Sequence, residues 1–93
     1  MPKNYIVVGK ITTSHGNRGE VKVLPLTDSL EQFSPGRKFQ VIQNNLPRIL
    51  EIEGVRQHKG FLIIKFIDVH HIHDAKLLRE TLLEIPRQEL VSL

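Results

Sequence analysis

The stretch VGKITTSHGNRGEVKV, residues Val8–Val23, decides how the rest of this chain is understood. Its flanks are rich in β-branched residues and predict two strands, Tyr5–Thr12 and Glu20–Leu26. The connector between them contains two glycines, Gly16 and Gly19. Glycine adopts positive φ angles and allows close backbone approach more easily than any other residue. The stretch therefore predicts two strands joined by a loop of defined shape near the N-terminus.

Short strands continue through the rest of the chain. Four more runs have strand character: Arg37–Gln43, Arg48–Arg56, Phe61–Ile67 and Leu82–Ile85. Turn-forming pairs, Asn44-Asn45 and Lys59-Gly60, mark two of the reversals, and the second predicts an antiparallel hairpin. The sequence therefore predicts an all-β domain, a six-stranded closed antiparallel β-barrel, because closure removes the exposed edges of a small sheet.

One or two short helices are expected beside the barrel. An acidic cap at Asp28 predicts the first, which Pro35-Gly36 ends after a turn or two. The second is predicted over His73–Arg79, where Ala75, Leu77 and Leu78 would form one apolar stripe.

The run Phe61–Ile67 has one polar residue, Lys65, so both faces of that strand are expected to be buried. Barrel closure covers one face. We expect a short helix or a second domain to cover the other.

Composition excludes several classes of protein. The 93 residues make one small domain, with 40% apolar and 25% charged residues as in soluble globular proteins. The absence of cysteine excludes disulfides and thiolate metal sites. No run reaches the roughly 18 apolar residues that cross a membrane, and Met1–Lys10 lacks the apolar stretch of a signal peptide. We therefore expect a cytoplasmic monomer with no membrane partner.

The net charge of +3 conceals an uneven distribution. Residues 1–26 carry four cations against one acidic residue, and residues 36–65 carry six against two. Residues 66–93 reverse the sign, with three cations against five acidic residues. This bias is compatible with a position near phosphate groups for the first two thirds of the chain. A solvated surface of mixed charge is the alternative.

Two groups of residues invite a catalytic or metal-binding interpretation. Ser14, His15 and Glu20 contain a nucleophile, a base and an acid, but a triad needs each group aimed by its neighbour, which one short loop rarely achieves. We therefore expect His15 to hold the loop. The turn His70-His71-Ile72-His73 offers imidazoles for a metal, with Asp68 or Asp74 as a further ligand. A solvated turn is the favoured interpretation, and no metal or cofactor is expected.

Four segments in register resemble the N-terminal domain of the RimM family of ribosome maturation factors. They are the opening His15-Gly16-x-x-Gly19-Glu20 motif, Thr27–Gly36, Ile52–Phe66 and Asp74–Pro86. The resemblance covers residues 5–90. Two departures stand out: Glu80 occupies a position where the family usually has glycine, and Lys76 one where it favours glutamate.

The resemblance implies a non-enzymatic assembly factor. Such proteins bind the free small ribosomal subunit through a ribosomal protein of its head, with small-subunit rRNA nearby, and assist its assembly and rRNA processing. Residues 1–93 would form the N-terminal barrel alone, without the PRC-type barrel that follows in the family. The residues expected to face the ribosome are His15, Gly16, Arg18, Gly19, Lys10, Lys22, Arg37 and Lys38.

Two other interpretations remain open. A stand-alone RNA-binding barrel, like the barrel domains of translation factors, has the same architecture and charge, so fold alone does not exclude it. A small enzyme or metal-binding barrel centred on the histidines is the third.

Overall fold

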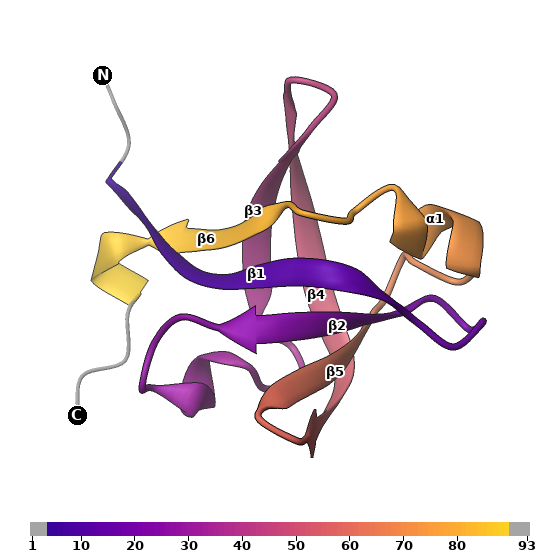
Figure 1. Cartoon of the computed structure of the whole chain (residues 1–93). Helices are drawn as coiled ribbons and strands as arrows, with labels where there is room; N and C mark the ends of the chain where they lie inside the picture. The colour runs from indigo at the N-terminus through magenta and orange to yellow at the C-terminus, as the bar shows by residue number, and fades with distance from the viewer. Residues whose placement is uncertain (1–3, 90–93) are drawn as a thin grey trace.

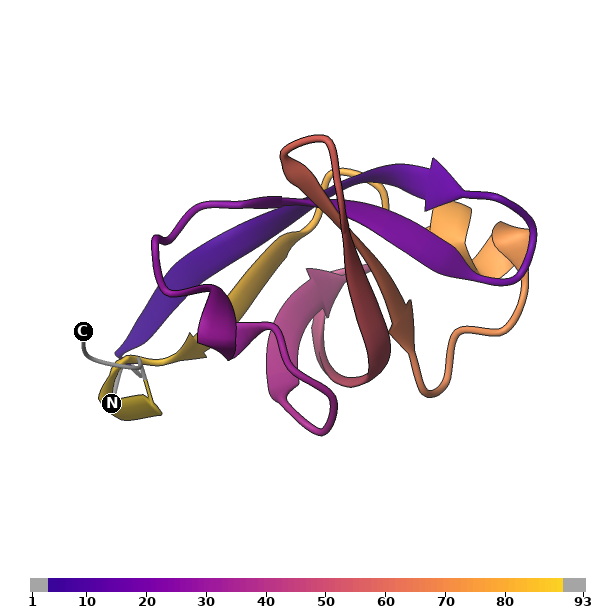
Figure 2. The ribbon, with the colours of Figure 1, turned by 90° about the horizontal axis from the view of Figure 1, so that it is seen from below.

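The computed structural model describes residues 4–89 and shows a six-stranded barrel with short helical turns, as predicted (Figure 1). The strands are β1 Tyr5–His15, β2 Glu20–Pro25, β3 Lys38–Gln43, β4 Leu46–His58, β5 Phe61–Phe66 and β6 Leu82–Pro86. The helical segments are the α-helix α1 Ile72–Lys76 and the 3-10 helices η1 Leu30–Gln32 and η2 Arg87–Glu89. Figures 1 and 2 place α1 beside the β1–β2 loop and η2 at the other end of the barrel.

The strands close in the order β1-β2-β5-β4-β3-β6, and every neighbouring pair is antiparallel. In a ring of this order, β2 and β3 stand on opposite walls, three steps apart in either direction. β1 bulges at Val8 on its β6 side and at Thr12 on its β2 side. Bulges bend a strand and increase its twist, which lets the long β1 curve around the barrel.

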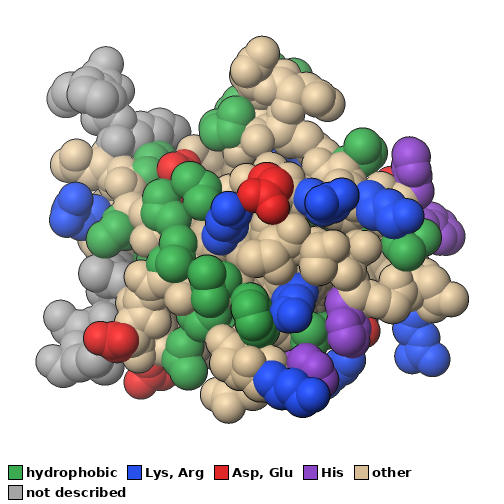
Figure 3. Space-filling model, viewed as in Figure 1, with side chains coloured by type: hydrophobic (Ala, Val, Ile, Leu, Met, Phe, Trp, Pro, Cys, Tyr) green, Lys and Arg blue, Asp and Glu red, His purple; other side chains and the backbone are tan. Residues whose placement is uncertain are grey.

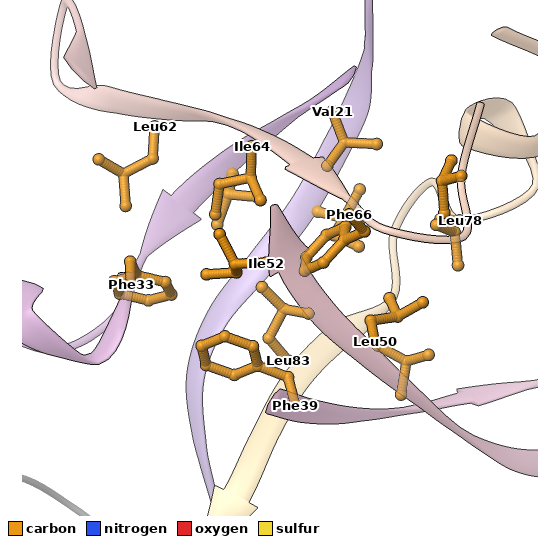
Figure 4. Close-up of a cluster of buried hydrophobic side chains, with 14 of the residues drawn as sticks. Val21, Phe33, Phe39, Leu50, Ile52, Leu62, Ile64, Phe66, Leu78 and Leu83 are labelled. Carbon is orange, nitrogen blue, oxygen red and sulfur yellow. The ribbon is translucent and has the colours of Figure 1, made fainter. Parts of the chain in front are cut away.

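Alternation along the strands builds the core. Val21 and Val23 of β2 are fully buried, whereas Leu24 lies on the outer surface. The same inward positions of the other strands supply the cluster shown in Figure 4. Phe33 follows η1 rather than a strand, and its ring stacks on that of Phe39 with centroids 5.6 Å apart. The segment after β2 therefore closes one end of the core.

Two predicted reversals are tight turns with positive φ angles. Asn44 and Asn45 have φ of 54° and 64°, and Lys59 and Gly60 have 52° and 83°. Two successive positive values are what a two-residue hairpin turn requires, because they match the twist of the flanking strands. The β4–β5 hairpin predicted from Lys59-Gly60 is confirmed.

The helical predictions need correction. The first segment forms only the 3-10 turn η1, and Ser29 precedes it without a side-chain cap. The second helix ends at Lys76, so the predicted stripe breaks: Ala75 and Leu78 are buried, but Leu77 is 58% exposed. A helix of five residues is too short to carry a stripe beyond its first turn.

The outer side of β5 is covered differently from the prediction. Ile63 is 1% exposed although it lies outside the core cluster. Its cross-strand partners are Lys22 on β2 and Arg56 on β4. Long basic side chains lay their methylene stems over apolar neighbours while the charged head stays in water. The neighbouring strands therefore cover the outer side of Ile63, and neither a helix nor a second domain is needed for this.

No helix among residues 4–89 is both long and apolar enough to cross a bilayer.

Candidate functional site

The β1–β2 loop owes its shape to two glycines. Gly16 has φ of +68° and no atom within 4 Å of an added Cβ, so the backbone conformation alone favours glycine there. Gly19 has φ of +91°, and a Cβ there would collide with the carbonyl oxygen of Val69. The expectation of positive φ and close backbone approach is confirmed, and the contact fixes the loop against the β5–α1 connection. Arg18 lies between the two glycines and is exposed.

Beside this loop, basic side chains line the outer face of β2, β5 and β4. The Nζ of Lys22 lies 4.2 Å from the centroid of the Phe61 ring, a distance at which the ring face attracts the cation. On the far side of Ile63, Arg56 Nη1 lies 3.4 Å from Glu20 Oε2. These contacts orient both cations over the outer surface, next to the loop.

Two histidines complete this surface. The rings of His15, at the end of β1, and His58, at the end of β4, have centroids 5.9 Å apart and are inclined by 55°. Glu20 pairs with Arg56 rather than with His15, so Ser14, His15 and Glu20 do not form a linked triad. His15 is partly buried, and its ring lies against that of His58 on the neighbouring hairpin.

We call this surface the basic face. Its cationic and imidazole side chains are Arg18, Lys22, Arg56, Lys59, His15 and His58. Glu20 is its acidic member. Figure 3 shows most of the basic and histidine side chains on the half of the molecule with α1 and the β1–β2 loop, and apolar side chains on the other half. A surface of this charge attracts polyanions.

Sequence reasoning missed three members of the basic face: Arg56, His58 and Lys59. All three belong to the predicted β4–β5 hairpin, so the local structure was foreseeable. Their position beside the β1–β2 hairpin depends on the pairing of β2 with β5, which are separated by 35 residues between Pro25 and Phe61. No short-range pattern in the sequence signals that pairing.

Lys10 has a different environment. It lies on β1 with Leu24 and Leu82 as its cross-strand partners, and its Nζ contacts Glu80 Oε1 at 2.8 Å. This hydrogen bond and the charge of Lys10 lower the pKa of the Glu80 carboxyl below its ordinary value. Lys10 is thus already neutralised by a partner on its own surface.

Arg37 and Lys38 lie apart from the basic face. Lys38 begins β3, on the wall opposite β2, and its register partner is Glu51. Arg37 immediately precedes Lys38, and its carbonyl oxygen accepts a hydrogen bond from the N–H of Ile52. The structure therefore groups His15, Gly16, Arg18, Gly19 and Lys22 and places these two cations elsewhere.

The histidine turn leads into α1. His71 is the residue before the helix and His73 lies within its first turn. Within residues 4–89, no three His, Asp or Glu side chains are placed to hold one metal ion.

The fold and its loops define a small antiparallel β-barrel domain. The family model for the RimM N-terminal domain matches residues 6–90. The chain belongs to the RimM family.

Individual relatives agree with the family match. The chain is 44% identical over 77 residues to the ribosome maturation factor RimM of Limosilactobacillus reuteri, covering 82% of this chain and 46% of that protein. It is 39% identical over 93 residues to that of Desulforamulus reducens, covering 100% and 55%. A crystal structure of a 16S ribosomal RNA processing protein RimM from Pseudomonas aeruginosa superposes with a TM-score of 0.84 at 31% identity, covering 96% of this chain and 54% of that one. The chain spans about half the length of the curated relatives it matches.

Proposed function

We propose that this chain acts in maturation of the small ribosomal subunit. In this role it binds the free subunit at its head through a ribosomal protein, with rRNA nearby, and assists assembly and rRNA processing without catalysing a reaction. Its site of action is the cytoplasm, and it acts as a monomer. The names of its relatives, ribosome maturation factor and 16S ribosomal RNA processing protein, support the role.

The basic face is the structural observation that supports a role of this domain in the proposed function. The pairing of β2 with β5 brings the β1–β2 hairpin, with Arg18 and Lys22, beside the β4–β5 hairpin, with Arg56 and Lys59, and Glu20 pairs with Arg56. Lysine and arginine contacts to phosphate supply most of the sequence-independent affinity for nucleic acid. The rigid barrel holds them at one surface, so the basic face is the part of the domain that meets rRNA.

The same face supports a second candidate, a stand-alone RNA-binding barrel. The two differ in what they recognise. A maturation factor discriminates the free small subunit from other RNA, whereas a general RNA binder does not, and its affinity falls steeply with salt for any RNA.

Cosedimentation separates these candidates. The chain is run on sucrose gradients with free small subunits, assembled ribosomes and naked 16S rRNA in turn. Comigration with free small subunits alone is the expected result. Equal binding to all three supports the general RNA binder. Binding to none overturns the proposal that this domain contributes its own affinity, and a full-length relative run in parallel shows whether the remaining half supplies it.

A further inference from the structure

The barrel is weakest at the junction of β3 and β6. These strands share one residue pair, Gln40 with Glu84, whereas β2 and β5, the next shortest ladder, pair through three residues each. If the same register continued, Lys38 of β3 would pair with Pro86 of β6, but Pro86 has no N–H to donate. The ladder therefore stops, and a groove of about 360 Å³ opens there.

This groove has apolar walls and an acidic rim. Its walls include Tyr5, Phe39, Ile49 and Pro86, and its polar lining is Lys38, Gln40, Glu84 and Glu89. Within residues 4–89, neither Glu84 nor Glu89 takes part in an ion pair. Among the described lining residues the cation is Lys38, which stands in register with Glu51 on β4. The two rim carboxylates are thus available to a positively charged ligand.

An exposed apolar surface continues from the groove. The β3–β4 hairpin projects from the barrel (Figure 1), and we call it the arm. Its outer face carries Ile42, opposite Pro47, and Ile49, with Ile42 and Ile49 50% and 56% exposed. Leu46, at the tip, is 67% exposed. Adjoining exposed apolar side chains of this kind mark contact surfaces for other macromolecules.

We infer that the arm and the groove bind an extended segment of a small-subunit protein, and that a lysine or arginine of this segment enters the groove. The inference rests on the proposed function, which supplies the subunit. The stem of a long basic side chain matches the apolar walls at Ile49 and Pro86. Its charged head reaches the carboxylates of Glu84 and Glu89, where charge-assisted hydrogen bonds form.

The chemistry of this surface favours protein over RNA. A phosphate backbone would meet the carboxylates of Glu84 and Glu89 and the apolar side chains on the outer face of the arm. An extended chain also suits the backbone, because among residues 4–89 β3 has no partner on its β6 side beyond Gln40, and such an edge pairs with an added strand. Since β3 stands opposite β2, protein at the arm and rRNA at the basic face can be bound together.

Photo-crosslinking to purified free small subunits tests the inference. One form of the chain carries p-benzoylphenylalanine at Ile49, on the arm, and another carries it at Lys59, on the basic face. We expect the Ile49 probe to label a protein at a segment containing lysine or arginine, and the Lys59 probe to label rRNA. Labelling of rRNA from Ile49 overturns the inference. Labelling from the Lys59 probe alone also overturns the inference about the arm and the groove, but it leaves the proposed function standing. If neither probe labels the subunit, the inference and the proposed function are both overturned.

Charge variants show whether the groove itself is occupied. In the Ile49-probe form, Glu84→Lys with Glu89→Lys lowers protein labelling about fivefold, the usual effect of removing a partly exposed ion pair and adding repulsion. The control, Asp68→Lys with Asp74→Lys, makes the same change in net charge beside and within α1, at the other end of the barrel from η2, and leaves labelling unchanged. An equal decrease in both variants indicates a general charge effect and overturns the role of the groove. Thermal unfolding confirms that each variant is folded.

Discussion

Gly19 and Val69 pack so closely that the loop between β1 and β2 has no room for a side chain at residue 19. A Cβ built on Gly19 would collide with the Val69 carbonyl oxygen and lie 2.8 Å from its carbonyl carbon. Gly19 also has φ of +91°, which strains any other residue. The glycine of the opening motif thus fixes the loop that carries Arg18 to the β5–α1 connection.

Replacing Gly19 by alanine is expected to destabilise the fold strongly. Gly19→Ala adds the strain of a positive φ to a clash with backbone, which has no flexible end that can move aside. The free energy of unfolding should fall by about 2–4 kcal/mol. Urea unfolding followed by far-ultraviolet circular dichroism measures it.

Gly16→Ala is the matched control. Gly16 has a similar φ of +68° but nothing within 4 Å of the added Cβ. The free energy of unfolding should therefore fall only by the conformational cost of a positive φ, about 1 kcal/mol. If the two variants are destabilised equally, the packing of residue 19 against Val69 does not contribute to the cost.

Local patterns in the sequence predicted most of the fold. Runs of β-branched residues marked the strands, and the pairs Asn44-Asn45 and Lys59-Gly60 marked their turns. Each of these signals lies within a few residues, where backbone preference and burial act directly. The first predicted strand is too short, because β1 runs on to His15.

The candidate site was predicted only in part, because it depends on contacts between distant segments. The loop residues His15 to Gly19 were identified from their motif. Arg56 lies on the same surface as these residues, whereas Lys38 lies on the opposite wall. Both positions result from the order of strands around the barrel, which no local pattern specifies. Leu77 was misplaced for a related reason, since its exposure depends on where α1 ends.

Glu80 offers a second test of backbone strain. It has φ of 67°, where the family usually has glycine, and its N–H donates to the Ile11 carbonyl at 2.8 Å. Glu80→Gly and Glu80→Ala both remove the ion pair with Lys10, but only glycine relieves the strain. Glu80→Gly should therefore melt about 4–8 °C above Glu80→Ala in circular dichroism. Equal melting temperatures would show that the left-handed backbone at this position costs nothing.

The ion pair of Glu80 with Lys10 predicts a pH dependence. Because Lys10 lowers the pKa of Glu80 in the folded state, the pair stabilises the fold fully above the ordinary carboxyl pKa. This contribution disappears as the pH falls through the lowered value, where Glu80 becomes protonated. Lys10→Met should raise the pKa of Glu80 toward its ordinary value, as measured by carboxyl carbon shifts in an NMR titration. An unchanged pKa in Lys10→Met would contradict the assigned cause.

The two walls of the barrel should contribute unequally to subunit binding. Arg18→Glu with Lys22→Glu changes the basic face, whereas Arg37→Glu with Lys38→Glu makes the same change in net charge on and beside β3, at the opposite wall. We expect the first pair to weaken binding to free small subunits and to reduce the slope of log K against log salt by about 0.7–0.9 for each phosphate that the domain no longer neutralises. The second pair should not reduce that slope, because one rRNA surface does not reach both walls of a closed barrel and Lys38→Glu only adds a carboxylate to the groove that receives a basic side chain. Binding isotherms at several salt concentrations measure both slopes. Equal reductions would mean that the subunit surrounds the domain, and an unchanged slope after Arg18→Glu with Lys22→Glu would remove the basic face from the interface.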